Sequence, residues 1–276
     1  MTLSRPAITA LLAEHGLHPS RALGQNFVAD PNTVRRIVRL AGVGAGTPVV
    51  EIGAGLGSLT LALAETGAAV VAVEVDRYLV PVLREVLAGT DVDVVEGDAL
   101  TLDWGSLLAR DPGPWSLVAN LPYNVAVPVT IGVLERAPMV AGLLVMVQRE
   151  VGERMAARAG EDAYGAVSVK VDYWSRAEVV GRVPATVFVP RPNVESVLVR
   201  LERRSAPAVD PSLVSYDRLF SVVRAGFAQR RKMLRRSLAA IVDPEAFEAA
   251  GVAPEARAEE LDVAQWGRLA GWAPPS

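Results

Sequence analysis

Four consecutive residues, Asn120-Leu121-Pro122-Tyr123, combine an amide, a rigid turn and an aromatic ring that together could do chemistry. They follow the short apolar run 116–119, which predicts a buried strand. At a strand end, such residues would form a small polar pocket with a flat aromatic wall. That pocket suits a planar ring bearing an amino group, and adenine fits it well. In isolation the motif favours the interpretation that Tyr123 is an ordinary aromatic residue of the core. The choice between this interpretation and a binding site depends on the other motifs of the chain.

The expected chemistry is attack by the exocyclic amine of adenine, which is a poor nucleophile because its lone pair is delocalised into the ring. We expect the side-chain oxygen of Asn120 and the carbonyl of Leu121 to accept the two amine hydrogens. Pro122 has no N–H to compete and stiffens the turn, while Tyr123 would stack on the ring. No general base is required, so catalysis would be mostly positioning and electrostatic preorganisation. The target base must be single-stranded or flipped out of its stack.

A glycine-rich loop, residues 51–57 (EIGAGLG), lies between a predicted strand and a predicted helix. A dinucleotide-binding loop would carry glycine where this chain has Ser58. The acid Glu51 followed by alternating glycines, Gly53, Gly55 and Gly57, is instead the usual loop for S-adenosylmethionine. The alternative is a plain tight turn between a strand and a helix.

Two further acids follow predicted strands. Glu74 closes the second strand of the alternating pattern, about 20 residues after the glycines, where a carboxylate accepts ribose hydroxyl protons. Asp98 follows the third strand and could accept a hydrogen bond from the exocyclic amine of an adenine ring. Each acid alone could be a solvated strand end. Three successive strand ends with polar groups nevertheless indicate a ligand site, because ligands bind at the carboxyl ends of parallel strands.

The elements that must position these groups alternate along the chain. Asp30 and Pro31 predict the start of a helix over 31–41, after a first helix over 7–15. Apolar runs then predict strands separated by helices, which indicates an α/β, doubly wound (Rossmann-like) sheet. The predicted strands are 48–52, 69–73, 92–96, 117–119, 142–148, 167–175, 177–183 and 194–202, the last as an edge or hairpin strand. The predicted helices between them are 58–66, 78–87 and 127–135.

Residues 205–211 are rich in proline and small side chains and predict a linker. Beyond it the pattern is helical, and the predicted helices are 215–227, 231–241, 244–250 and 263–272. We therefore predict a methyltransferase domain over 1–206, with an N-terminal extension over 1–30, and a small all-helical RNA- or ribosome-binding domain over 207–276.

Composition narrows the function classes. Of the 276 residues none is cysteine, which excludes disulfides and thiolate metal sites, and the two histidines, His15 and His18, have no accompanying carboxylate cluster, so we expect no metal. No apolar run is long enough to span a membrane, and a cytoplasmic protein is expected. The net charge of −3 gives no global nucleic-acid signal, so any such contact must be local.

A local basic cluster occupies residues 224–236, which contain no acid. Their spacing on a helix would put several of them on one face. Six uncompensated cations in an acidic protein predict contacts to RNA phosphates, although a solvated helix face is the usual alternative. We expect the apolar neighbours Phe227, Met233, Leu234 and Leu238 to pack inward. The predicted RNA-binding residues are Arg224, Arg230, Arg231, Lys232, Arg235 and Arg236.

The ordered set of motifs resembles the KsgA-type family of small-subunit (16S) rRNA adenine N6,N6-dimethyltransferases over nearly the whole chain. The matching segments are 23–27 (LGQNF), 51–57, Glu74, 97–99 (GDA), 120–124 (NLPYN), 148–151 (QREV), 187–194 (VFVPRPNV) and 227–234 (FAQRRKML). Position 28 is Val where this family commonly has Leu. The implied contact of residue 28 with the cofactor would be made by its backbone and by the volume of its side chain, so we keep Val28 as a cofactor-binding residue.

The resemblance implies methyl transfer from S-adenosylmethionine to the N6 of two adjacent adenines near the 3′ end of 16S rRNA, during late small-subunit assembly. It also implies that Phe188 packs against the target ring. The implied partner of the protein, a monomer, is the small ribosomal subunit with its 16S rRNA, and neither DNA nor a membrane is an expected partner. The implied cofactor-binding residues are Gln25, Asn26, Val28, Gly53, Gly55, Glu74, Asp98, Ala99 and Asn120.

Four other interpretations remain. A related family methylates an adenine of large-subunit rRNA, but segment 227–234 favours the small-subunit family. DNA adenine methylation would require a separate target-recognition domain. A pure assembly factor would have lost Glu74, Asp98 or Tyr123, and all three are present. A nicotinamide oxidoreductase is disfavoured by Ser58 and by the lack of a proton-donating histidine in the sheet.

Overall fold

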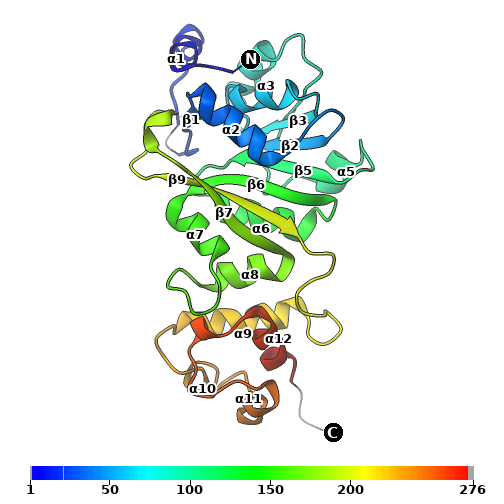
Figure 1. The fold of residues 1–276 in the computed structure, drawn as a ribbon, viewed down its shortest axis with the longest axis vertical. Coiled ribbons are helices and arrows are strands. Elements are labelled where there is room, and N and C mark those ends of the chain that lie inside the picture. The colour runs from blue at the N-terminus through cyan, green and yellow to red at the C-terminus, as the bar shows by residue number, and fades with distance from the viewer. Residues whose placement is uncertain (1, 21, 273–276) are drawn as a thin grey trace. The chain divides into compact units, whose positions relative to one another are not determined.

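In the computed structural model, which describes residues 2–20 and 22–272, apolar runs form a seven-stranded sheet (Figure 1). Its strand order is β4-β3-β2-β5-β6-β9-β7. The neighbouring strands from β4 to β6 are parallel, and β9 is antiparallel to β6. The strands are β2 (Pro48–Ile52), β3 (Ala69–Glu74), β4 (Asp93–Glu96), β5 (Trp115–Asn120), β6 (Val140–Gln148), β7 (Ser175–Val183) and β9 (Ser196–Arg203).

This arrangement confirms the predicted doubly wound α/β fold. The first strand of the pattern, β2, has β3 on one side and β5 on the other, so the strand order reverses direction between β2 and β5. At such a switch point the loops after adjacent strands diverge and leave a crevice for a ligand. The five predicted strands from 48–52 to 142–148 each lie within an observed strand or within one residue of it.

Two compact units divide the chain: residues 1–152 with 178–202, and residues 153–177 with 203–276. Of these ranges, Met1, Arg21 and residues 273–276 lie outside the described residues. The helices that begin in the first unit are α1 (Arg5–Glu14), α2 (Pro31–Ala41), α3 (Ser58–Ala64), α4 (Leu79–Val86), α5 (Trp104–Leu108), α6 (Ala126–Arg136) and α7 (Arg149–Ala156), with a short 3-10 helix over Ala185–Val187.

Helix α2 shows how the sequence sets these elements. The Asp30 side chain accepts the Thr33 N–H at 2.8 Å and caps the helix, and Pro31 occupies its first turn, as predicted. Val34 and Ile37 are buried in a core cluster with Val118 of β5. Just before α2, β1 (Phe27–Val28) pairs antiparallel with β8 (Phe188–Val189), which fixes the N-terminal loop on the first unit.

The second unit is helical, with α8 (Ala166–Trp174), α9 (Tyr216–Ala228), α10 (Leu234–Ser237), α11 (Pro244–Ala250), α12 (Val263–Gly271) and a 3-10 helix over Ala258–Glu260. Its core gathers large aromatic residues, among them Tyr173, Phe220, Phe247 and Trp266, each at most 2% exposed. None of the helices that the structure describes is long and apolar enough to cross a membrane.

The prediction of a strand over 167–175 is wrong for residues 167–174, which lie in α8, whereas Ser175 begins β7. Val167, Val169, Val171 and Tyr173 alternate in the sequence, which is typical of a strand. Val169 and Tyr173 are also four residues apart, so they share one helix face, and both pack into the core of the second unit. This packing explains why residues 153–177, which we expected in the first domain, group with the C-terminal helices. The predicted division of the chain into two domains at residue 206 stays a prediction.

Two smaller expectations also differ. Of the predicted helix 231–241, only α10 is helical. The helix does not begin at residue 231, because the N–H groups of Leu234 and Arg235 donate to the carbonyls of Ala256 and Pro254 and not to carbonyls of a preceding helical turn. Met233 is therefore 37% exposed, not packed inward as we expected, whereas Leu234 is fully buried. The strand predicted over 194–202 is β9, and its place between β6 and β7 makes the edge interpretation wrong.

Candidate active site

A pocket of the first unit lies at the carboxyl ends of β2, β3, β4 and β5. It brings together the sequence-predicted residues from five separate segments of the chain. Those that line it are Gln25, Asn26, Val28, Gly53, Gly55, Glu74, Asp98, Ala99, Asn120, Leu121, Pro122 and Tyr123. Ser58 and Ile8 also line it, although we had assigned them no role there, and so does Glu51, the acid of the predicted cofactor loop.

The glycine loop after β2 turns back sharply at Gly53 (φ +74°) and Gly55 (φ +59°). Both angles lie in the left-handed region, where a side chain is strained. At Gly55 a Cβ would also stand 3.0 Å from Cε1 of Phe27. Glycine at this position therefore lets the loop pass close to the N-terminal segment and leaves backbone exposed to the pocket.

Glu74 is held rigidly at the end of β3. Its carboxylate accepts the N–H groups of Gly55 (2.7 Å), Asp76 (2.9 Å) and Val75 (3.0 Å), and the residue is 5% exposed. Burial raises the pKa of Glu74, although the three N–H bonds oppose that shift. Since a carboxylate offers about four acceptor sites, one remains for a ligand.

Glu51 is a site residue whose burial the sequence did not reveal. It is 1% exposed on β2, and its Oε2 has no hydrogen-bond partner among the described residues. Burial, reinforced by the charge of Glu74, raises the pKa of Glu51 to about 8. The pocket wall thus holds two acidic groups, one of which is protonated at neutral pH.

The loop of residues 22–26 closes the pocket from the N-terminal side. The Gln25 side chain donates to Asp76 Oδ2 (2.7 Å) and accepts from the Ser20 N–H (2.7 Å), and Asn26 Nδ2 donates to the Gly24 carbonyl (3.0 Å). Asp76, two residues beyond Glu74, was not predicted as a site residue. Its role becomes visible only through this bond to a loop 51 positions earlier.

The end of β5 carries the predicted amine-binding groups. Asn120 Nδ2 donates to the Asn26 carbonyl at 2.9 Å, which fixes the amide and leaves its Oδ1 as an acceptor. The N–H of Leu121 donates to the Met146 carbonyl at 3.1 Å. Within the described residues no hydrogen bond is recorded to Oδ1 of Asn120 or to the carbonyl of Leu121, and both residues line the pocket.

Tyr123 stands on the pocket wall, half-buried. Its hydroxyl lies 3.1 Å from the Ser196 hydroxyl, which orients the ring from its far end. Burial raises the pKa of Tyr123, so the phenol stays neutral at physiological pH. Ser196 lies 73 residues further along the chain, and nothing in its sequence neighbourhood indicated this role.

Asp98 follows β4 and is exposed at the pocket rim. One carboxylate oxygen accepts the Leu100 N–H at 2.9 Å. Phe188, by contrast, is not brought to the pocket surface. It is 1% exposed in the core cluster that contains Val34 and Leu198, and it pairs with Val28 across the β1–β8 ladder. Stacking of Phe188 on a ring in the pocket stays a prediction that would require this side chain to leave the core.

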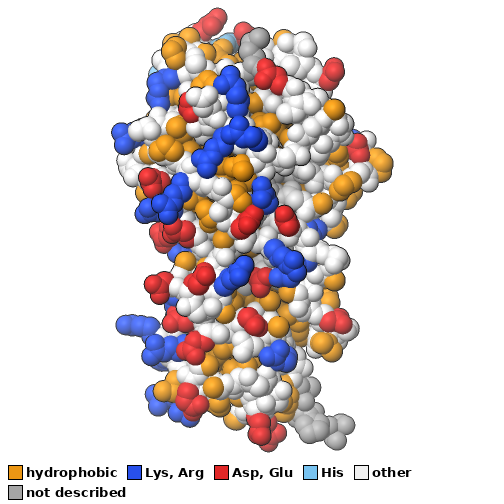
Figure 2. Space-filling view, in the orientation of Figure 1, with side chains coloured by type: hydrophobic (Ala, Val, Ile, Leu, Met, Phe, Trp, Pro, Cys, Tyr) orange, Lys and Arg blue, Asp and Glu red, His pale blue; other side chains and the backbone are white. Residues whose placement is uncertain are grey.

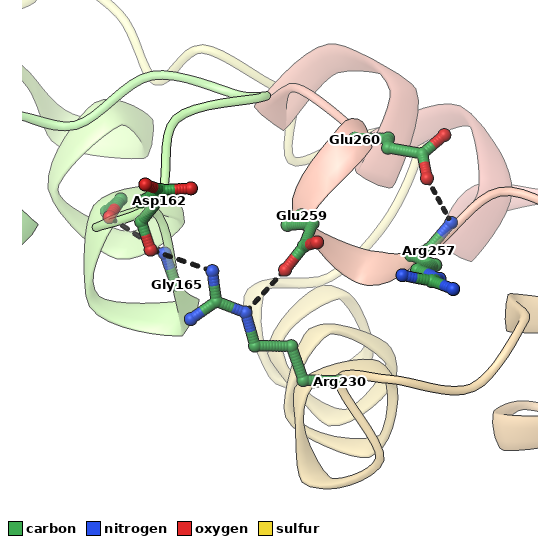
Figure 3. A network of polar contacts seen from close by, with 7 residues as sticks. Asp162, Gly165, Arg230, Arg257, Glu259 and Glu260 are labelled. Atoms are coloured by element: carbon green, nitrogen blue, oxygen red, sulfur yellow. Dashed lines mark hydrogen bonds and ion pairs between the residues drawn. The ribbon is translucent and has the colours of Figure 1, made fainter.

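The predicted RNA-binding cations lie in the second unit, on α9, α10 and the turn between them. They do not share one helix face, and two of them are compensated by distant acids. Arg230 bonds to Glu259 and to the Asp162 carbonyl (Figure 3), and Arg235 pairs with Glu255 at 2.7 Å. The expectation of six uncompensated cations is therefore wrong for these two. Among the described residues no ion pair is recorded for the four others, Arg224, Arg231, Lys232 and Arg236, and all four are exposed.

Comparisons with known proteins agree with this geometry. Residues 18–273 match the family model described as ribosomal RNA adenine dimethylase. The protein named Ribosomal RNA small subunit methyltransferase A of Leifsonia xyli subsp. xyli is 50% identical over 283 residues, covering 98% of both chains. Its counterpart in Thermobifida fusca is 47% identical over 278 residues, covering 95% of this chain and 93% of the relative.

Two solved structures have similar folds. The 23S rRNA methyltransferase ErmE has 28% identity and a TM-score of 0.70, with 88% of this chain and 98% of ErmE covered. A dimethyladenosine transferase from Plasmodium falciparum has 22% identity and a TM-score of 0.72, with coverage of 87% and 94%. The second likeness supports the fold alone.

Proposed function

The chain belongs to the ribosomal RNA adenine dimethylase family, and we propose that it transfers methyl groups from S-adenosylmethionine to small-subunit rRNA. The acceptor in this proposal is the N6 of two adjacent adenines near the 3′ end of 16S rRNA, and the products are N6,N6-dimethyladenines formed late in small-subunit assembly. The observation that carries the proposal is a pair of hydrogen-bond acceptors, Asn120 Oδ1 and the Leu121 carbonyl, for which no donor is recorded among the described residues. They lie next to Tyr123 in the sequence, and all three residues line the pocket at the switch point of the sheet.

The pocket residues fit the methyl donor. Glu51 Oε2 and Ser58 Oγ are buried polar atoms without a partner among the described residues, and both residues line the pocket. Burial of polar atoms without hydrogen bonds is costly, which favours a polar ligand there. Glu74 would accept from the ribose hydroxyls, Asp98 from the adenine amine, and the glycine loop would allow close approach of the methionine part. S-adenosylmethionine supplies an electrophilic methyl group on a cationic sulfur.

The chain's own residues hold the accepting amine. Asn120 Oδ1 and the Leu121 carbonyl each accept one amine hydrogen, which draws the lone pair out of conjugation and orients it. Because the Asn26 carbonyl anchors the Asn120 amide, this arrangement exists before the substrate arrives and needs little reorganisation. Tyr123 stacks on the flipped base. A monomethylated amine has only one hydrogen left, so one acceptor loses its partner in the second transfer.

The other partners are also proposals. Arg224, Arg231, Lys232 and Arg236 of the second unit would contact phosphates, and a cytoplasmic monomer would bind the small ribosomal subunit. A second candidate substrate is large-subunit rRNA, favoured by the likeness to ErmE. Relatives named for the small subunit are far more similar, at 47–50% identity over nearly the full length, and they support the first candidate.

The test is methyl transfer from labelled S-adenosylmethionine to two substrates, both from cells that lack this protein. The first is intact small subunits and the second is large-subunit RNA, each digested to nucleosides afterwards. We expect dimethyladenosine from the small subunits alone. Label in large-subunit RNA would contradict the small-subunit assignment, and absence of label in both would contradict the enzymatic proposal.

A further inference from the structure

Helix α2 presents an unusually basic surface. Residues 31–41 contain three arginines and no acid. The apolar residues Val34 and Ile37 are buried on one side, so Arg35 and Arg39 are exposed on the other and Arg36 is partly exposed. A solvated helix face normally mixes both signs of charge, because like charges three or four residues apart repel.

Two further arginines extend this surface within the first unit. Arg36 Nη1 donates to the Arg182 carbonyl at 2.8 Å, which sets the end of β7 beside α2, and Arg182 is exposed. Arg5 of α1 donates to the carbonyls of Thr186 (2.7 Å) and Phe188 (3.2 Å). We call the set Arg5, Arg35, Arg36, Arg39 and Arg182 the arginine face. Figure 2 shows Lys and Arg side chains gathered over α2 and the strand ends next to it.

Among the described residues, no ion pair with a carboxylate is recorded for the arginine face, in contrast to Arg230 and Arg235 of the second unit. The carboxylate recorded as attracting one of its members is Asp30, the cap of α2, whose pKa is lowered mainly by its hydrogen bond to the Thr33 side chain and also by the charge of Arg35. Glu178, an acid on β7, is engaged by Arg200 at 3.0 Å. The bonds of Arg5 and Arg36 go to backbone carbonyls, so the donors that remain on each guanidinium, and its full charge, are available.

The arginine face begins at the wall of the active-site pocket. Val28 lines the pocket and pairs with Phe188, whose carbonyl accepts from Arg5. The next residues lead directly into α2, which begins at Pro31. At 1.5 Å per residue, Arg35 and Arg39 lie about 6 Å and about 12 Å along the helix from Pro31. The two cations therefore lie about one turn apart along a helix that starts three residues after Val28, which lines the pocket.

We infer that the arginine face binds the phosphate backbone of the substrate RNA next to the target adenines. This inference rests on the proposed function, since a base held in the pocket brings its flanking phosphates close to the pocket wall. Arginine suits phosphate because its planar donors bind two oxygens at once. In a chain of net charge −3, five neighbouring cations that form no ion pair among the described residues give a local positive field that attracts a polyanion. The catalytic unit would thereby hold the RNA itself, independently of the cations of the second unit.

The experiment compares the full-length protein with the triple variant Arg35→Gln, Arg39→Gln and Arg182→Gln, which leaves the carbonyl-bound Arg5 and Arg36 in place. The probe is a hairpin RNA with two adjacent adenines in its loop, and the dissociation constant is measured over a range of salt concentrations. Each lost phosphate contact lowers the slope of log K against log salt by about 0.7 for single strands, so the slope should fall by about 2. Between about 50 and about 200 mM salt, the factor by which affinity falls should then be about 20 times smaller for the variant than for the wild type.

The control carries the same change in net charge elsewhere in the unit. Arg84→Glu with Ala88→Glu lowers the net charge by three on and just after α4, a helix that packs on β4 at the opposite edge of the sheet from β7. A control slope close to that of the wild type, together with a raised KM of the triple variant for small subunits, supports the inference.

Equal slopes for the triple variant and the control would overturn it. It would equally be overturned if the triple variant bound the hairpin normally but small subunits weakly, because the face would then contact a ribosomal protein. Failure of the proposed function has a different signature, namely absence of methyl transfer to small subunits by the wild type.

Discussion

Replacing Glu51 with Gln should make the protein less sensitive to alkaline pH. Glu51 is 1% exposed, and burial raises its pKa from 4.5 to about 8. At 1.36 kcal/mol per pKa unit, ionising this buried group costs about 5 kcal/mol of folding free energy at most. The native state binds the proton more tightly than the unfolded state does, so stability is highest below pH 4.5 for this group and falls as the pH rises through 8.

About half of that cost develops between about pH 6 and about pH 9. Glu51→Gln keeps the shape of the side chain and removes the titration. The assay is urea unfolding of both proteins across this pH range, because the wild-type-minus-variant difference cancels all other titrating groups. Glu14→Gln, at an exposed surface position, is the control. Parallel profiles of the wild type and Glu51→Gln would refute the assignment of a buried, protonated carboxyl at the pocket.

Three other substitutions test the site's geometry. Gly55→Ala should lower the melting temperature by an amount equivalent to about 1–2 kcal/mol, because the left-handed backbone penalises Cβ and Phe27 lies 3.0 Å away; an unchanged melting temperature would contradict the close approach. Tyr123→Phe should keep most methyl transfer, since it loses only the bond to Ser196, whereas Tyr123→Ala should lose it through lost stacking; equal rates for the two variants would contradict the stacking role. Phe188→Ala should destabilise the protein by about 3–5 kcal/mol in urea unfolding because the side chain is fully buried; normal stability with lost methyl transfer would instead support its contact with the substrate ring.

The polar groups at strand ends were predictable because their positions follow from local pattern. Glu74 and Asn120 each end a largely apolar run, and the carboxyl ends of parallel strands meet at one edge of a sheet. Once the runs were recognised as strands, the pocket followed from topology alone. The glycine loop was predictable for the same reason, since its glycines come directly after the first of those strands.

The groups that sequence reasoning missed act through contacts distant in the chain. Asp76 holds Gln25, and Ser196 orients Tyr123, but neither partner is near in the sequence. The compensation of Arg230 by Glu259 was hidden for the same reason. Phe188 was placed by resemblance to a motif, whereas its strand pairing with Val28 turns the ring into the core. Helix α8 was misassigned because alternation and a four-residue repeat coexist in one segment, and only tertiary packing distinguishes them.

The central claim is that Asn120 Oδ1 and the Leu121 carbonyl hold the amine of the target adenine. Its most direct test is nucleoside analysis of small subunits treated with saturating S-adenosylmethionine and wild type, Asn120→Ala or Asn124→Ala. Asn124 is a matched control because it is an exposed asparagine of the same loop. We predict dimethyladenosine with the wild type and with Asn124→Ala, and a loss of about 100-fold or more in rate with Asn120→Ala, as for removal of one preorganised hydrogen-bonding group. Equal rates for Asn120→Ala and Asn124→Ala would contradict the claim.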